Sequence, residues 1–119
     1  MLTYRDGGGP QNPGSIVGRP LVFTRHDEPE RVLLRIEGTL DIHTAPELRG
    51  ALEEVVAASP PRVVLELDGL TFLDSSGVGA IVGLFKRIRA AGGDVVMKGV
   101  TGQPLTVCKL LKLDRVFGA

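Results

Sequence analysis

The sequence predicts one α/β domain, in which a mixed sheet of four or five strands packs with three helices. Two observations predict this class. Apolar and polar residues first alternate over two neighbouring segments, as in an antiparallel hairpin, and segments with strand and helix periodicity then follow each other in turn. Because a helix between two strands of one sheet forms a right-handed parallel crossover, the later strands are expected to be parallel.

The start of the chain differs in composition from the rest. Residues 1–20 are rich in glycine and proline and hold few apolar side chains, so burial would not repay the entropy lost on ordering them. We therefore predict a flexible tail over residues 1–20 and one domain over residues 21–119, a length that suits a single core.

The hairpin is predicted from residues 21–26 and 31–37, which are joined by a turn that contains Pro29. A helix follows, because Thr44 and Glu47 have the spacing of a capping box and Pro46 falls in the first turn, where its missing amide donor costs nothing. The sequence Ser59-Pro60-Pro61 ends this helix.

The second half of the chain alternates between strands and helices. Residues 63–67 form a near-continuous apolar run, which is typical of a central strand covered on both faces. The further elements are expected to be a helix over residues 76–91 that ends at Gly92-Gly93, a strand over 94–99, a helix from 101 or 102 to 113, and a short strand over 115–117.

Composition excludes several classes of function. Fourteen basic and fourteen acidic side chains cancel, and four Phe and one Tyr offer few stacking surfaces, so direct binding of nucleic acid is not expected. No apolar run approaches the ~20 residues that span a bilayer, so we expect no membrane partner and a cytoplasmic protein. Cys108, His26 and His43 lack the spacing of metal ligands, and no cofactor is expected.

The candidate site is the sequence Asp74-Ser75-Ser76-Gly77, which precedes the second predicted helix. In a purely structural interpretation, a serine here caps the helix, which is worth about 1 kcal/mol. In a functional interpretation, the positive end of the helix dipole and its unpaired amides accommodate a phosphate on Ser76 without unfolding the domain.

Two enzyme interpretations are disfavoured. Gly77 and Gly79 suggest a dinucleotide-binding fingerprint, but the third glycine is Gly83, one position too late. Ser75 as a nucleophile at a strand-to-helix turn would need a leading glycine where Leu73 stands. We therefore do not expect an enzyme.

Two blocks of sequence resemble a known family. They read EGTLDIHTAPEL at residues 37–48 and FLDSSGVG at residues 72–79, and the similarity extends from about residue 21 to residue 117. In these blocks the chain resembles the STAS-domain anti-sigma factor antagonists, which are phosphorylatable partners of serine kinase anti-sigma factors in bacteria. Family members usually continue past the final strand into another amphipathic helix, whereas this sequence ends at Ala119.

The resemblance implies a phosphorylation site at Ser76 and a partner-binding surface around it. The residues implied for that surface are Asp41, Thr44, Asp74, Ser75, Ser76 and Gly77. Asp41 and Thr44 would lie beside the serines, with helix capping as the structural alternative. The Asp74 carboxylate would help to position the serine hydroxyl and would repel an added phosphate.

The resemblance further implies that the unphosphorylated form binds a serine kinase anti-sigma factor and frees a sigma factor. Phosphorylation of Ser76 would switch binding off, and a serine phosphatase would restore it. Two alternatives remain open at this stage. One is a STAS scaffold subunit of a stress-signalling assembly, and the other is a STAS module that binds a small ligand at the helix start.

Overall fold

The structure is a computed structural model that describes residues 2–5 and 20–113. Six strands and three helices occupy these residues. In chain order they are β1 (Leu2–Arg5), β2 (Val22–Asp27), β3 (Val32–Leu40), α1 (Ala45–Ala57), β4 (Arg62–Glu66), β5 (Leu70–Leu73), α2 (Ser75–Ala90), β6 (Asp94–Lys98) and α3 (Gly102–Leu110).

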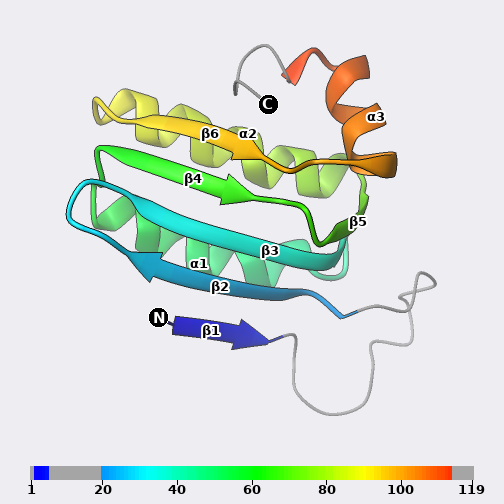
Figure 1. Cartoon of the computed structure of the whole chain (residues 1–119), viewed down its shortest axis with the longest axis horizontal. Helices are drawn as coiled ribbons and strands as arrows, with labels where there is room; N and C mark the ends of the chain where they lie inside the picture. The colour runs from blue at the N-terminus through cyan, green and yellow to red at the C-terminus, as the bar shows by residue number, and fades with distance from the viewer. Residues whose placement is uncertain (1, 6–19, 114–119) are drawn as a thin grey trace.

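The sheet is mixed, with the strand order β1-β2-β3-β4-β6, and β5 pairs with β3 beside this path (Figure 1). The pairs β1–β2 and β2–β3 are antiparallel, whereas β3–β4, β4–β6 and β3–β5 are parallel. The predicted class, hairpin and parallel crossovers are therefore confirmed. β4 lies between β3 and β6, as expected for the most apolar strand.

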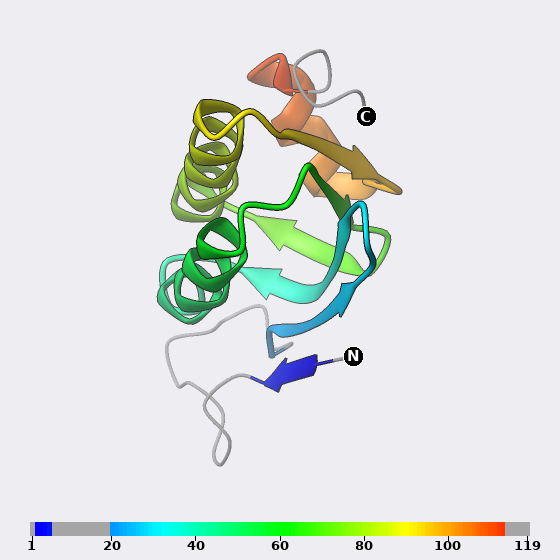
Figure 2. The same ribbon diagram turned by 90° about the vertical axis from the view of Figure 1, so that its left-hand side faces the viewer.

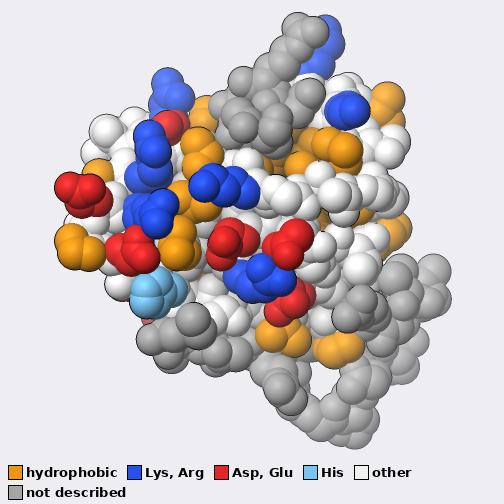
Figure 3. All heavy atoms as spheres, viewed as in Figure 1, with side chains coloured by type: hydrophobic (Ala, Val, Ile, Leu, Met, Phe, Trp, Pro, Cys, Tyr) orange, Lys and Arg blue, Asp and Glu red, His pale blue; other side chains and the backbone are white. Residues whose placement is uncertain are grey.

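Helices α1 and α2 cover one face of the sheet, and α3 lies at the end where β5 is found (Figures 1 and 2). The alternation along β3 explains this layering, because Leu34 and Ile36 are buried against the helices while Arg35 points to the other face. On that other face Arg35 pairs with Asp68 at 2.9 Å and lies 3.6 Å from Glu37. Charged side chains of both signs gather on this face of the molecule (Figure 3).

β3 is the element that carries the chain to the candidate site. Its first half pairs with β4 and its last three residues pair with β5, with a register shift after Gly38. Gly38 has φ +91°, and a Cβ atom there would lie 2.0 Å from the carbonyl oxygen of Pro20. Only glycine fits this bend. The strand therefore runs three residues beyond the predicted end at residue 37 and reaches Leu40.

The beginning of the chain differs from the predicted tail. Leu2–Arg5 form β1, which pairs with β2 from Leu2 opposite Arg25 to Arg5 opposite Val22. Composition did not predict this strand, because the free backbone groups at the edge of β2 can pair with a segment almost regardless of its side chains. Residues 6–19 of the predicted tail and the predicted strand over 115–117 lie outside the described residues.

Candidate functional site

The candidate site lies where β3 and β5 end side by side. Leu40 is opposite Leu73 in the parallel register, and the amide of Asp74 donates to the carbonyl oxygen of Leu40 at 3.3 Å. Parallel strands place their carboxyl ends at the same edge of a sheet, so the segments that follow them meet there. The structure thus brings residues 41–44 next to residues 74–77, as the resemblance implied.

Asp74 caps α2 and ties the two segments together. Its Oδ1 accepts hydrogen bonds from the amides of Ser76 at 2.9 Å and Gly77 at 3.1 Å, and its Oδ2 accepts one from the amide of Ile42 at 3.1 Å. The expectation that a serine caps this helix is therefore wrong. Aspartate is an equally good cap, and the helix begins one residue earlier than predicted, with Ser75 and Ser76 in its first turn.

This cap changes the expected environment of a phosphate. The sequence predicted that unpaired amides at the helix start would accommodate a phosphate, but the amides of Ser76 and Gly77 already donate to Asp74. The group beside Ser76 is thus a carboxylate, which repels an added phosphate rather than binding it. Ser75 is exposed and Ser76 is half-buried.

Asp41 and Thr44 are buried and bind the loop between β3 and α1. Asp41 Oδ1 accepts from the amides of His43 at 2.9 Å and Thr44 at 3.1 Å. The Thr44 hydroxyl donates to the carbonyl oxygen of Thr39 at 2.9 Å and accepts from the amide of Asp41 at 3.0 Å. Both side chains therefore hold the loop in shape, which leaves Ile42 and His43 exposed at its tip.

The predicted capping box at the start of α1 is not formed. Thr44 is the N-cap residue, but its side chain makes no cap hydrogen bond because its hydroxyl is used by the preceding loop. The spacing to Glu47 is that of a capping box. The tertiary position of β3 decides against it, since the buried carbonyl group of Thr39 needs a donor.

Gly77 permits the close packing of α2 on the strand ends. It is buried, and a Cβ atom there would lie 2.6 Å from Leu73 Cδ1, 2.7 Å from Leu40 Cγ and 2.9 Å from the carbonyl oxygen of Leu40. A larger residue would push the first turn of α2 away from β3 and β5. The serines would then move with it.

Gln103 of α3 is a contributor that the sequence reasoning missed. Its Oε1 accepts from the amide of Leu73 and its Nε2 donates to the carbonyl oxygen of Leu73, both at 2.8 Å. The side-chain amide thus takes the place of a strand partner at the free edge of β5. A lone glutamine near a helix start carries no signal of such a contact, because its periodicity matches that of an ordinary exposed residue.

An apolar cleft of about 240 Å³ adjoins Ser75, the first of the two serines. It is lined by Leu73, Asp74, Ser75 and Val78 on one side and by Val107, Leu110 and Leu111 of the α3 region on the other. Ile42, Leu110 and Leu111 are the large hydrophobic side chains that are most exposed within the described part of the chain, at 65%, 77% and 53%. Such clustered exposure is typical of a surface that another molecule covers.

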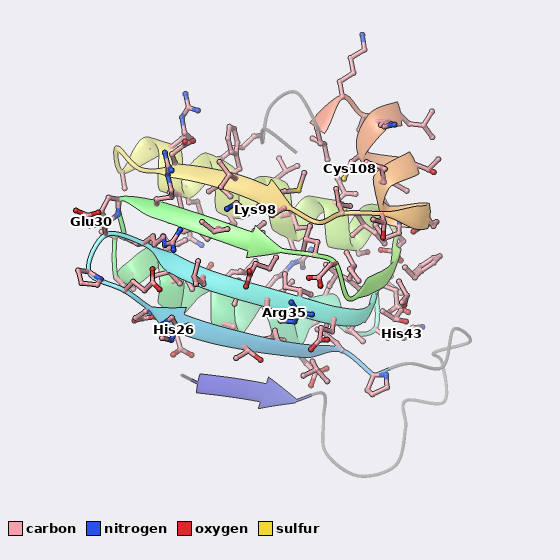
Figure 4. The ribbon with its side chains drawn as sticks, in the orientation of Figure 1. His26, Glu30, Arg35, His43, Lys98 and Cys108 are labelled. Atoms are coloured by element: carbon pink, nitrogen blue, oxygen red, sulfur yellow. The ribbon has the colours of Figure 1, made fainter. Side chains whose placement is uncertain are left out.

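No group of three or more His, Cys, Asp or Glu side chains that could hold a metal ion is found among the described residues. His26 on β2, His43 in the loop before α1 and Cys108 on α3 lie well apart (Figure 4). No helix of the described residues is long and apolar enough to cross a membrane.

Comparison with protein families gives a match to the STAS domain over residues 22–118. An anti-sigma F factor antagonist from Paenibacillus polymyxa is 36% identical over 87 residues, which cover 72% of this chain and 72% of that protein. The anti-sigma-F factor antagonist RsfB from Mycobacterium tuberculosis is 34% identical over 87 residues and 71% of each chain.

Solved structures share the fold. An anti-sigma factor antagonist from Mycobacterium paratuberculosis superposes with a TM-score of 0.71 at 28% identity, covering 82% of both chains. The phosphorylated form of the Bacillus cell fate determinant SpoIIAA has a TM-score of 0.66 at 23% identity, covering 78% of this chain and 86% of SpoIIAA. At that level of identity the second comparison supports the fold alone.

Proposed function

The chain belongs to the STAS domain family, and on that basis we propose that it is an anti-sigma factor antagonist that is switched by phosphorylation of Ser76. The unphosphorylated form binds a serine kinase anti-sigma factor and frees a sigma factor. The kinase then phosphorylates Ser76 and dissociates from the protein. A serine phosphatase removes the phosphate and restores the binding form. In this proposal the chain is a regulator and not an enzyme.

One observation carries the proposal. Ser75 lines the cleft together with the exposed Leu110 and Leu111, and Asp74, the residue before the serines, accepts a hydrogen bond from the amide of the exposed Ile42. A partner that covers these apolar side chains also covers the serines. Because hot spots near the centre of an interface dominate binding, a change at the serines would be felt strongly by the complex.

The switch follows from the charges at this point. A phosphoserine adds about 1.5 to 2 negative charges, and here they would lie beside the Asp74 carboxylate, whose amide donors are already in use. A docked partner would bury these charges without a local counterion from this turn. Since an unpaired buried charge costs several kcal/mol, one phosphate can weaken the complex a hundredfold or more.

The fold is expected to persist after phosphorylation. The cap of α2 comes from Asp74 and not from the hydroxyl groups of the serines, so modifying a serine removes no hydrogen bond that holds the helix start. Leu73 and Gly77, which pack the turn against β3, keep their contacts as well. The switch therefore acts on the surface, by exchange of partners.

Ser76 is preferred over Ser75 because the resemblance places the acceptor at the second serine of the motif. Ser75 is the more exposed of the two, so the choice needs a direct test. Intact-mass spectrometry after incubation with ATP and each candidate serine kinase anti-sigma factor from the same organism provides it. The wild-type protein is compared with Ser76→Ala and Ser75→Ala.

The proposal expects one added phosphate in the wild type and in Ser75→Ala, and none in Ser76→Ala. Phosphate that persists in Ser76→Ala but is lost in Ser75→Ala would move the acceptor to Ser75. Absence of phosphorylation with every kinase, in a folded protein, would overturn the switch. Co-purification with a large assembly would then support the scaffold function. The small-ligand alternative is less favoured, because the cleft of about 240 Å³ is smaller than most ligand sites.

A further inference from the structure

The peptide group that joins Leu73 to Asp74 is held from both sides. Its carbonyl oxygen accepts a hydrogen bond from Gln103 Nε2 at 2.8 Å, and its amide donates to the carbonyl oxygen of Leu40 at 3.3 Å. Gln103 Oε1 also accepts from the amide of Leu73 at 2.8 Å. We propose that Gln103 is a positioning residue, which orients the serine turn for phosphorylation by setting the plane of this peptide group.

The two hydrogen bonds of Gln103 fix an orientation, not merely a distance. The planar side-chain amide pairs with both the N–H and the C=O group of one residue, Leu73, as the backbone of a neighbouring strand would. In the described chain β5 pairs with β3 alone, so its outer edge depends on this side chain. The bond to Leu40 then fixes the opposite side of the same peptide group.

The orientation of this peptide group determines where the two serines lie. Asp74 is the next residue, and its carboxylate binds the amides of Ser76 and Gly77. A rotation of the peptide group moves the Asp74 carboxylate and with it the first turn of α2. Displacing a reacting group by about 1 Å can reduce a reaction rate by about a hundredfold, so a small rotation is enough to slow phosphoryl transfer.

Loss of the Gln103 side-chain amide is expected to change the orientation of the serine turn more than the stability of the fold. The Leu73 side chain is buried in the core and stays there without Gln103, and Gln103 itself is exposed, so water can replace its hydrogen bonds. The exposed apolar side chains of Ile42, Leu110 and Leu111 are not altered chemically by a substitution at Gln103, so we expect their surface to persist. Affinity for the partner should therefore change less than the rate of transfer.

Two substitutions separate the two hydrogen bonds. Gln103→Met keeps the length of the side chain and removes both bonds, whereas Gln103→Glu retains an acceptor for the Leu73 amide but opposes the Leu73 carbonyl oxygen with a carboxylate. Lys109→Met is the matched control, because Lys109 is an exposed residue of the same helix. Ile88→Val, a change in the core near the far end of α2, controls for stability.

This inference depends on the proposed function for its kinetic test. With the cognate kinase, Gln103→Met is expected to lower the kcat for phosphorylation of Ser76 about tenfold while KM stays within about twofold, whereas Lys109→Met and Ile88→Val leave both near the wild-type values. Gln103→Glu is expected to lower kcat as well. A rise in KM with kcat unchanged, or equal effects in the controls, would overturn the inference.

A second measurement needs no kinase. In ¹H–¹⁵N NMR spectra, Gln103→Met is expected to shift the amide resonances of Ser76 and Gly77 and to speed hydrogen exchange at the Leu73 amide, beyond any change in Lys109→Met. Unchanged resonances in Gln103→Met would refute the positioning role whether or not a kinase acts on the protein. Shifted resonances in a protein that no kinase phosphorylates would refute the proposed function alone. If Gln103→Met fails to fold, Gln103→Glu serves for the same measurement.

Discussion

The Asp74 carboxylate should contribute about 2 kcal/mol to the free energy of unfolding. Two of its three amide donors belong to the first turn of α2 and one to Ile42 in the loop after β3. Loss of a helix cap costs about 1 kcal/mol. The hydrogen bond to the Ile42 amide adds about 1 kcal/mol, at the low end for a charged acceptor, because Ile42 is exposed and water can replace the carboxylate.

Two substitutions distinguish these contributions. Asp74→Ala removes both and is expected to cost about 2 kcal/mol, which lowers Tm by about 8–10 °C in a domain of this size. Asp74→Asn keeps an oxygen for the amides of Ser76 and Gly77 but turns an NH2 group toward the amide of Ile42. It should therefore cost about 1 kcal/mol, half as much as the alanine variant.

The assay is urea unfolding followed by circular dichroism, with the slope m compared to confirm that the same surface is exposed. Asp27→Ala is the matched control, since Asp27 is an exposed carboxylate that pairs with Arg25, and such a pair is worth about 0–1 kcal/mol. If Asp74→Asn were as damaging as Asp74→Ala, the carboxylate would act mainly as the tie between the two segments. If Asp74→Ala had no effect, the capping argument would be refuted.

Three further predictions concern the same region. Gly77→Ala should destabilise the protein by about 1–3 kcal/mol in thermal unfolding, because its Cβ atom would overlap Leu40. Gly79→Ala is the control and should be neutral or stabilise by up to about 1 kcal/mol, because a Cβ atom there meets nothing within 4 Å. Equal effects of the two substitutions would contradict the packing argument. Thr44→Val should cost about 2–4 kcal/mol in urea unfolding, because two buried backbone groups lose their partner, and a loss below about 1 kcal/mol would show that water reaches the loop. Thr39→Val should be neutral or stabilise by up to about 1 kcal/mol in the same assay, because the buried Thr39 hydroxyl has no hydrogen-bond partner; clear destabilisation would reveal one.

The fold class could be predicted because it depends on patterns that repeat along the chain. The alternation in residues 31–37 and the apolar run in residues 63–67 specify which side chains must be buried, and a sheet covered by helices is the way to bury them. The short strands β1 and β5 could not be predicted in this way. β1 is held at the edge of β2, and β5 is held between β3 and the side chain of Gln103.

The candidate site was predicted as a set of residues but not as a set of contacts. The motif placed Asp74, Ser75 and Ser76 at a helix start, and this is where α2 begins. The carboxylate of Asp74 caps the helix, whereas a serine hydroxyl was expected. The Thr44 hydroxyl binds the carbonyl oxygen of Thr39, whereas an amide of α1 was expected. The bond between Asp74 and the amide of Ile42, in turn, depends on a segment that lies more than thirty residues away in the sequence.

The sequence by itself determined the α/β class, the parallel second half and the position of the serine pair at the start of a helix, because periodicity, glycine and proline act over a few neighbouring residues. Only the tertiary structure decided that Asp74 holds Ile42, that Asp41 and Thr44 are buried in a loop and that Gln103 completes the edge of β5. The physical reason is that a polar group satisfies its hydrogen bonds with whichever partner burial brings near, and that partner is fixed by the packing of distant segments.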